Sequence, residues 1–382
     1  MHICFFAQDH SIEAGANQSM LSLITKLMED GNRVSVILTR RGSLENQFKK
    51  LDVSYYICYT PSVTIEVDNT RKKTLVYLIK ILVILINTFF LSLKLRSEKI
   101  NLIHINKAVG IAGVYLANRL HVHYIWHLRE FMEEDYRRKF QYPNHVYKLM
   151  NNSSDIIAIS QSIKNKYQKY IKNNIKVIYN GIETKSIEYC KNKFQSKSIK
   201  ILMAGTITEG KRQLDAIKAV KLLREKYDIK LIIIGKVLSA DYYNLLLEYI
   251  IDNDLSSLIE FKEFTNNLNV ERKQCDIGLL CSEKEAFGRV TIETMLSGML
   301  FVGSNSGGTK ELVENNVNGL LYKMGDVLSL VQTIDYALNN KDKMHTIIQN
   351  AYEYAMNNYS IEKTYENINK VYQGVLKNGF ND

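Results

Sequence analysis

The segment Glu285-Ala-Phe-Gly-Arg-Val-Thr-Ile-Glu293 decides the fold of this 382-residue chain. It follows an apolar run at 277–281 that is typical of a buried strand, and it opens a helix near Val290. At such a helix start, the backbone N–H groups of residues 287–289 favour a bound phosphate. The two glutamates flank this loop, and each carboxylate can accept hydrogen bonds from a vicinal diol. The spacing therefore fits a ligand that carries a diol on either side of a pyrophosphate.

On both sides of this segment, short apolar runs alternate with helical patterns. Continuous apolar strands joined by helices are typical of parallel sheets covered on both faces. Two successive rounds predict an α/β chain of two doubly wound, Rossmann-like domains that face each other across a central cleft. We expect domains at 1–185 and 186–358, and a C-terminal helix at 359–382 that crosses back to the first domain. The expected strands are 2–7, 34–38, 53–58, 102–105, 123–126, 156–159, 176–178, 199–204, 230–234, 259–261, 277–281, 300–303 and 319–322.

The decisive segment resembles the signature of glycosyltransferase family 4, retaining enzymes of the GT-B fold, of the type found in bacterial surface-polysaccharide synthesis. Their E-x7-E motif has a setting like E-G-F-G-x-x-x-x-E, and this chain has E-A-F-G-R-V-T-I-E. Downstream, Met295-Leu-Ser-Gly298 and Ser306-Gly-Gly-Thr-Lys-Glu-Leu312 also look like the family, whereas Cys281-Ser282 stands where Pro-Ser is usual. The resemblance implies that Glu285 contacts the hydroxyls of the donor sugar, as a catalytic residue, and that Glu293 binds the ribose. It also implies that the pyrophosphate is held by the backbone of Phe287, Gly288, Arg289 and Val290.

A second stretch, Ala204-Gly-Thr-Ile-Thr-Glu-Gly-Lys-Arg-Gln213, is similar to the family's G-R-x-x-x-x-K-G segment. Gly205 and Lys211 match that segment, so the resemblance places both at the donor diphosphate, with Lys211 neutralising its charge during catalysis. Thr206 occupies the arginine position and Arg212 the second glycine position, so one phosphate-binding cation is missing from its usual place. We hypothesise that Arg289 replaces it, because Arg289 lies in the phosphate loop itself and fixed cations stabilise a leaving diphosphate.

The first half carries weaker matches. Glu13-Ala-Gly-Ala-Asn17 resembles the family's G-G-A loop, which places Gly15 near the donor diphosphate and the acceptor. His127 lies at the end of an expected strand, where family members carry a histidine beside the donor sugar. It is therefore our candidate polar group of the active site, with a core or capping histidine as the alternative. The adjacent Arg129 and Glu130 are expected to contact the acceptor or neighbouring loops.

The implied reaction moves a hexose-type sugar from a nucleoside diphosphate to an acceptor hydroxyl with retention. We expect a UDP-sugar donor, with a GDP-sugar as the alternative, and no further cofactor. Asp252-Asn-Asp254 lies at an expected helix end, so we predict no metal site and no requirement for a divalent metal. A sugar-nucleotide epimerase of similar fold would convert the donor without an acceptor. The third alternative is an inactive sugar-nucleotide-binding scaffold, against which the presence of both glutamates and Lys211 argues.

The positive charge is concentrated in the first half. Residues 1–180 hold 25 Lys and Arg against 14 Asp and Glu, whereas the remainder holds 25 against 26. Such a basic half favours an anionic partner. The apolar run 75–93 is long enough to span a bilayer, but it lies between two expected strands. We favour a buried crossover helix, then a helix that touches the bilayer surface, and least of all a true span.

These features together predict a lipid-linked or saccharide acceptor and a cytoplasmic enzyme, with the inner face of the plasma membrane as an anionic surface for peripheral binding. Arg137-Arg-Lys139 is the one basic cluster flanked by aromatic residues, so no nucleic acid partner is expected. The five cysteines form no C-x2-C pair, and four of them lie in apolar runs, as small buried residues do. The run at 1–7 is interpreted as a first strand and not as a signal peptide.

Overall fold

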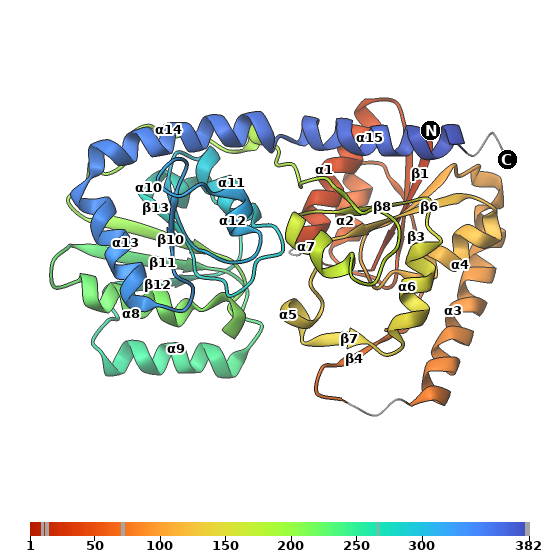
Figure 1. Cartoon of the computed structure of the whole chain (residues 1–382), viewed down its shortest axis with the longest axis horizontal. Coiled ribbons are helices and arrows are strands. Elements are labelled where there is room, and N and C mark those ends of the chain that lie inside the picture. The colour runs from red at the N-terminus through yellow and green to blue at the C-terminus, as the bar shows by residue number, and fades with distance from the viewer. Residues whose placement is uncertain (9–10, 12–14, 70–72, 266, 379–382) are drawn as a thin grey trace. The chain divides into compact units, whose positions relative to one another are not determined.

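The computed structural model describes residues 1–8, 11, 15–69, 73–265 and 267–378. The chain forms two compact units (Figure 1). Unit 1 comprises Met1–Gly181 and the C-terminal segment from Ile361, and unit 2 comprises Ile182–Ser360. These divisions fall within a few residues of the predicted boundaries at 185 and 358.

Unit 1 is built on a seven-stranded parallel sheet in the order β3-β2-β1-β5-β6-β8-β9. Its central strands are almost wholly buried, which explains why their sequences are continuous apolar runs. All seven strands were predicted, with ends that differ by one or two residues. They are β1 (His2–Ala7), β2 (Arg33–Leu38), β3 (Ser54–Ile57), β5 (Leu102–Ile105), β6 (His123–Leu128), β8 (Asp155–Ala158) and β9 (Lys176–Val177).

Helices connect these strands, and the last helix of the chain completes the unit. Helix α15 lies beside α1 (Figure 1), and its Ile368, Val371 and Tyr372 join the buried core around Phe5. An apolar stripe on α15 at helical spacing therefore closes one side of the unit. The helices are α1 (Gly15–Glu29), α2 (Leu44–Lys50), α3 (Thr74–Leu95), α4 (Ile111–Leu120), α5 (Glu133–Tyr136), α6 (Pro143–Asn151), α7 (Gln161–Tyr167) and α15 (Ile361–Asn378), with a 3-10 turn η1 (Arg96–Glu98).

Two features of unit 1 differ from the prediction. Helix α3 is a crossover helix, as expected, but it is not buried: only 22% of its most apolar window is covered. It is the one helix among the described residues that is long and apolar enough to cross a membrane. The short antiparallel pair β4 (Thr64–Glu66) and β7 (Arg138–Phe140) was not predicted, because three-residue strands leave no periodic pattern.

Unit 2 carries a second parallel sheet, in the order β12-β11-β10-β13-β14-β15. All six strands were predicted, and they bury a core that α8, α13 and α14 cover. The strands are β10 (Ile199–Ala204), β11 (Ile229–Ile234), β12 (Ile259–Lys262), β13 (Ile277–Leu280), β14 (Leu300–Ser304) and β15 (Leu320–Tyr322). The helices are α8 (Gln213–Leu223), α9 (Ala240–Asp252), α10 (Asn269–Gln274), α11 (Arg289–Leu296), α12 (Thr309–Leu312), α13 (Val327–Asn339) and α14 (Lys341–Asn358), with 3-10 turns η2 (Thr184–Ser186) and η3 (Glu209–Lys211).

Each sheet has one switch point, where successive strands continue in opposite directions. In unit 1 it lies between β1 and β5, and in unit 2 between β10 and β13. Loops at the carboxyl ends of these strands diverge there and leave room for a ligand. The switch points therefore define where polar side chains of each unit can gather.

Candidate functional site

In unit 2, the two loops that the sequence singled out meet at the switch point. The loop after β10 contains Gly205 and leads through η3 to Lys211, and the loop after β13 leads to Gly288 at the start of α11. The backbone N–H of Glu283 donates to the carbonyl of Gly210 across 2.9 Å, which ties the loops together. Both loops are therefore held at the same edge of the sheet.

The side chains of Lys211 and Glu285 contact each other at this junction. Lys211 Nζ donates to Glu285 Oε2 across 2.7 Å, and the two side chains are 28% and 18% exposed. An ion pair with this exposure adds little to stability, because water screens it. Because this ion pair lies where the two loops meet, a ligand at the switch point could contact both the cation and the carboxylate.

The backbone of the Glu285 loop is set by the neighbouring Ser306-Gly-Gly-Thr309 turn. The N–H of Gly308 donates to the carbonyl of Glu285 across 2.7 Å. Gly307 has φ +49°, and a Cβ there would lie 2.5 Å from the carbonyl oxygen of Glu285. Only glycine permits that conformation and that approach. The turn therefore fixes where Glu285 points.

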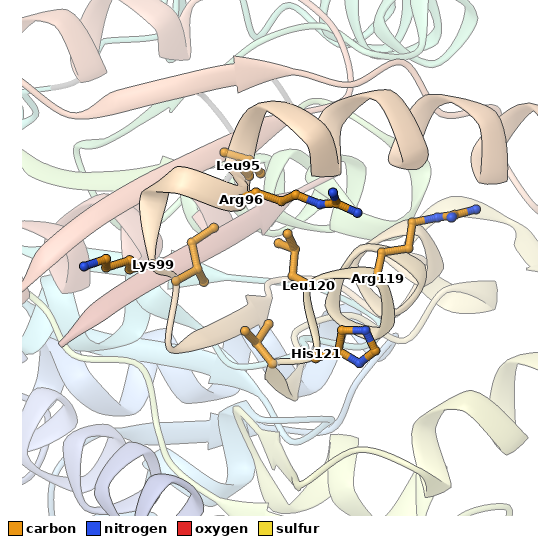
Figure 2. A pocket seen from close by; sticks show the side chains of 8 residues that line it. Leu95, Arg96, Lys99, Arg119, Leu120 and His121 are labelled. Atoms are coloured by element: carbon orange, nitrogen blue, oxygen red, sulfur yellow. The ribbon is translucent and has the colours of Figure 1, made fainter.

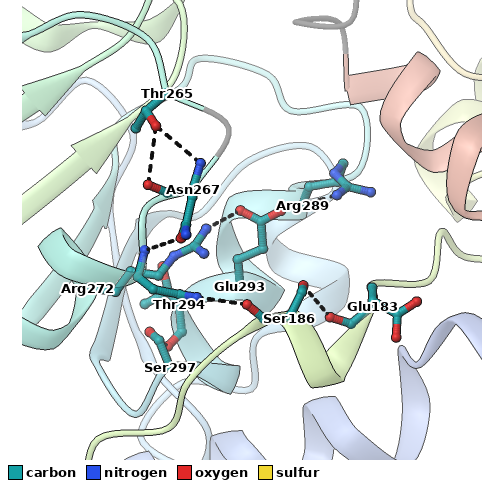
Figure 3. Close-up of polar contacts among 10 residues, drawn as sticks. Glu183, Ser186, Thr265, Asn267, Arg272, Arg289, Glu293, Thr294 and Ser297 are labelled. Carbon is teal, nitrogen blue, oxygen red and sulfur yellow. Dashed lines mark hydrogen bonds and ion pairs between the residues drawn. The ribbon is translucent and has the colours of Figure 1, made fainter. Parts of the chain in front are cut away.

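Glu293, one turn into α11, lies between two guanidinium groups (Figure 3). Its Oε2 accepts from Arg272 across 2.5 Å, and its Oε1 accepts from Arg289 across 3.3 Å. The side chains of Glu293 and Arg272 are 15% and 10% exposed, so solvent screens this pair only weakly. Arg272 comes from α10, and the sequence analysis missed it because no motif marks it.

The loop that was predicted to hold the pyrophosphate lies at the start of α11, and its binding role stays a prediction. Phe287 and Gly288 are buried, and Gly288 has φ +100° directly before α11, which begins at Arg289 next to Val290. The guanidinium of Arg289 reaches back to Glu293, so in this structure it stabilises a carboxylate of the same site. Its predicted replacement of the arginine missing at position 206 stays a prediction.

The backbone conformation at Arg212 is one that favours glycine, the residue that the family has at this position. It has φ +55°, in the left-handed region that glycine adopts most easily. Its guanidinium pairs with Asp215 through Nε at 2.7 Å, one turn into α8. Arg212 therefore adopts a strained backbone conformation while its side chain is held by a local ion pair.

In unit 1, His127 lies near the carboxyl end of β6 and is 1% exposed. Its Nδ1 lies 3.2 Å from Nη2 of Arg129 and 3.1 Å from Nε2 of His104. Burial, then the charge of Arg129 and the neighbouring His104, hold the pKa of His127 well below its usual value, so the ring is neutral at pH 7. Arginine can only donate, so Nδ1 accepts and the proton resides on Nε2.

That Nε2–H group is buried, and it has no hydrogen-bond partner within the described parts of the chain. On the other side of the network, His104 Nδ1 is within 2.6 Å of the hydroxyl of Tyr372 on α15. Arg129 and His104 thus orient the ring of His127 through its Nδ1 atom. A neutral, oriented imidazole with an unsatisfied N–H is suited to donate a hydrogen bond to a ligand oxygen.

Arg129 and Glu130 contact neighbouring loops, one of the two outcomes expected for them. Arg129 donates to the side-chain oxygens of Asn106 and Asn180, and Glu130 accepts from the N–H of Ala108 across 2.9 Å. Glu130 is 2% exposed, and burial raises the pKa of its carboxyl to about 7. These residues connect the loops at the carboxyl edge of the sheet.

The remaining predicted features of unit 1 are partly covered by the structure. Gly15 is the first residue of α1, whereas Glu13 and Ala14 of the proposed G-G-A loop lie outside the described residues. Among the other residues of unit 1, Ser160 caps α7, since its hydroxyl accepts from the N–H of Ile163. Asn180 accepts from Arg129, so the two residues link the segments that follow β9 and β6.

No group of three or more His, Cys, Asp or Glu side chains that could hold a metal occurs among the described residues. Asp252 ends α9, as the sequence predicted for the Asp252-Asn-Asp254 stretch. Arg138 and Lys139 of the basic cluster donate to Thr64 and to the carbonyl of Val67, so they hold the β4–β7 pair. Cys4, Cys58, Cys275 and Cys281 are buried free thiols, as predicted.

Comparison with known families gives two adjoining matches. The model of "Glycosyltransferase Family 4" matches residues 14–186, and that of "Glycosyl transferases group 1" matches residues 186–354. The two matches meet close to the division between the units. Together they extend over nearly all of the described chain, including Lys211, Glu285 and Glu293.

Individual relatives show the same kinship. An uncharacterised glycosyltransferase of Methanocaldococcus jannaschii is 29% identical over 286 residues, which cover 73% of this chain and 77% of that protein. The capsular polysaccharide biosynthesis glycosyltransferase CapM of Staphylococcus aureus is 26% identical over 252 residues, which cover 59% of this chain and 63% of CapM. The crystal structure of Anabaena HepE in complex with UDP and glucose matches with a TM-score of 0.81 at 20% identity, over 98% of this chain and all of HepE. At that identity the structural match establishes the GT-B fold alone.

Proposed function

The chain belongs to the glycosyltransferases of Family 4 and group 1, and we propose that it transfers a sugar from a UDP-sugar to an acceptor hydroxyl with retention at the anomeric carbon. The observation that carries the proposal is the cluster at the switch point of unit 2, where Lys211, Glu285 and Glu293 lie on loops and a helix start at one sheet edge. A similar fold that holds UDP and glucose in HepE supports UDP as the nucleotide.

The donor is bound by unit 2 in this proposal. Glu293 accepts hydrogen bonds from the ribose diol, and its ion pairs with Arg272 and Arg289 hold the carboxylate in place. Lys211 leaves Glu285 for the diphosphate, which frees Glu285 to accept from hydroxyls of the donor sugar. In the free protein the ion pair thus holds Lys211 near the expected diphosphate and Glu285 near the expected sugar hydroxyls.

Bond cleavage develops negative charge on the leaving UDP. The cation of Lys211 and the N-terminal end of α11 stabilise that charge, because both contact the diphosphate of the bound donor before the bond breaks. Arg289 adds a second cation when donor phosphate competes with Glu293 for its guanidinium. No divalent metal is required in this scheme.

We assign His127 a role in orienting the donor sugar. Its neutral Nε2–H can donate to a sugar hydroxyl, and its low pKa argues against a general acid. Glu130 is buried and held by the N–H of Ala108, so it is poorly suited to be a covalent nucleophile. These observations support attack of the acceptor on the same face as the departing phosphate, which itself takes the proton.

The acceptor that we propose is a saccharide, carried by a lipid, in the synthesis of a cell-surface polysaccharide at the inner face of the plasma membrane. Support comes from CapM, whose name places it in capsular polysaccharide biosynthesis, and from the basic unit 1. A positively charged acceptor unit attracts a pyrophosphate-linked or anionic acceptor.

A panel of nucleotide sugars tests the proposal. The nucleotide sugar that raises the unfolding temperature most is incubated with saccharide acceptors, and the anomeric coupling constant of the product is read by NMR. We expect a UDP-sugar, a retained configuration and unchanged activity after treatment with a chelator. Conversion of the donor to its epimer without an acceptor would instead indicate an epimerase, and binding of UDP without turnover would indicate a scaffold.

A further inference from the structure

Helix α3 has two opposite apolar faces in different surroundings. One face packs against α4 and the rest of unit 1, and buries Tyr77, Ile84 and Leu91. Figure 1 shows α4 on the inner side of α3 and no element of unit 1 on its outer side. The outer face exposes side chains by 45% to 72% at a spacing of three and four residues: Leu75, Ile79, Leu82, Ile86, Phe90 and Leu93.

These six side chains form one continuous stripe, which we call the α3 apolar face. At 100° per residue they fall within a sector of about 80°, along a helix about 33 Å long. Apolar patches of this extent are uncommon on the surface of a soluble protein, and they mark sites of interaction. Because the six residues are spaced by three and four positions, they form one face of the helix and are not single exposed residues scattered around it.

The opposite face anchors α3 along the surface of unit 1. Asn87 Nδ2 donates to the carbonyl of Tyr59 across 2.8 Å, and the hydroxyl of Tyr77 lies 2.7 Å from Nδ1 of His145. A transmembrane orientation would break these contacts and expose the buried side of α4. The helix is therefore suited to lie flat in the interface of a membrane, with one side on protein and the other in lipid.

A basic cavity lies at the C-terminal end of α3 (Figure 2). It has a volume of about 330 Å³, and Leu95 and Ile100 are among its apolar lining residues. Its lining also includes the basic side chains of Arg96, Lys99, Arg119 and His121, and no acidic side chain lines it. Figure 2 shows the side chains of Arg96 and Arg119 extending to the same side.

Two contacts of Arg119 connect this cavity to α3 beside the α3 apolar face. The guanidinium of Arg119 lies 5.2 Å from the ring centre of Phe89 on α3, and its Nη2 is 3.4 Å from the carbonyl of Leu85. Glu98, the acidic residue nearest in sequence, is engaged by Arg33 and by the hydroxyl of Tyr56. The cations that line the cavity are therefore not neutralised by Glu98.

We propose that the α3 apolar face inserts into the interface of an anionic bilayer and that the basic cavity binds the phosphate of an anionic lipid headgroup. An apolar stripe beside cations is the arrangement that interfacial helices use, because acyl chains accept the stripe and lipid phosphates accept the cations. A second copy of the chain could also cover the stripe, but it would bring another strongly basic unit against the same surface. The inference deepens the lipid-linked acceptor of the proposed function, yet its test needs no sugar transfer.

The test is sedimentation of the full chain with vesicles of phosphatidylcholine alone, or of phosphatidylcholine mixed with phosphatidylglycerol, at low salt. We expect binding to the mixed vesicles and far weaker binding to phosphatidylcholine alone. The double variant Leu82→Gln/Phe90→Gln should weaken binding at least about tenfold per substitution, because each residue loses the burial of an apolar side chain. The matched control is Ile251→Gln/Leu328→Gln, which changes equally exposed apolar residues of unit 2 and should bind as the parent does.

A second pair of variants tests the cavity. Arg96→Gln/Arg119→Gln should weaken binding to the mixed vesicles about fivefold per charge, whereas Lys191→Gln/Lys197→Gln removes the same charge elsewhere and should have little effect. All these side chains are exposed, so unfolding temperatures should stay unchanged. Equal losses in both charge variants would overturn the cavity as the headgroup site.

Three outcomes would overturn the proposal as a whole. They are no binding to the mixed vesicles at low salt, equal binding to both vesicle types, and a dimer in solution that Leu82→Gln/Phe90→Gln dissociates. Turnover of a water-soluble acceptor without vesicle binding would refute this inference and leave the proposed sugar transfer intact. Vesicle binding without any sugar transfer would support this inference and refute the proposed sugar transfer.

Discussion

Replacement of Glu293 by Gln separates the two glutamates of the decisive segment. In the free protein the change removes the carboxylate between Arg272 and Arg289, and leaves the 10%-exposed Arg272 side chain without its counter-charge. We expect a loss of about 1–3 kcal/mol in the unfolding free energy of unit 2, because a poorly solvated charge loses its partner. For a unit of this size, that loss corresponds to about 3–10 °C in unfolding temperature.

The effect on nucleotide binding follows from the role proposed for Glu293. Gln keeps one acceptor oxygen, so one charge-assisted hydrogen bond to the ribose diol is lost. Such a bond contributes about 1.5–3 kcal/mol, so the Kd for UDP should rise about 10- to 150-fold. The Kd for the UDP-sugar should rise by the same factor, because the sugar is contacted elsewhere.

Isothermal titration calorimetry with UDP and with the preferred UDP-sugar measures both constants. In Glu285→Gln we expect the Kd for UDP to change little and the extra affinity conferred by the sugar to fall. The exposed Glu260→Gln in unit 2 is the matched control and should change neither. Unchanged binding of UDP in Glu293→Gln, or a larger loss in Glu285→Gln, would refute the assignment of ribose to Glu293.

Other predictions concern single residues. Arg289→Ala should lower kcat about ten- to a hundredfold if this side chain stabilises the leaving diphosphate, and an unchanged kcat in steady-state assays would exclude that role. Gly307→Ala puts a Cβ 2.5 Å from the backbone of Glu285, so it should weaken binding of the UDP-sugar in calorimetry. The control is Gly31→Ala, where φ is +72° and a Cβ would have no neighbour within 4 Å. That variant carries only the backbone strain of about 1–2 kcal/mol. As the pH rises from 5 to 8, the unfolding free energy of Glu130→Gln should increase by about 2–3 kcal/mol relative to that of the parent, as measured by urea unfolding. The reason is that the parent carboxyl, with its pKa raised to about 7, opposes folding once it ionises. Parallel stability curves for the Gln variant and the parent across this pH range would contradict the account of Glu130.

Most of the fold was predictable because its strands are buried on both faces. Runs such as His2–Ala7 and Ile229–Ile234 are apolar without interruption, and the helices between them follow the helical period. The β4–β7 pair was missed because each strand has three residues and the paired residues are more than 70 positions apart in the sequence. The exposure of α3 was misjudged because an apolar sequence does not reveal how many of its faces are covered.

The candidate site divides in the same way. Glu285, Glu293 and Lys211 could be identified because their types and spacing follow a pattern along the chain. Arg272 could not be found, because its carboxylate partner lies 21 residues away and on another helix. The orientation of His127 was likewise hidden, since it depends on Arg129, on His104 and, behind them, on Tyr372 from α15.

The sequence by itself determined the two Rossmann-like sheets and the loops that bear the site, because hydrophobic periodicity and glycine positions act locally along the chain. Only the tertiary structure decided which charges meet: Lys211 with Glu285, and Arg272 with Glu293. Ion pairs form between side chains that folding brings together from different elements, and no local pattern records that proximity. For the same reason, only the packed structure shows that α3 leaves one of its two apolar faces exposed to solvent.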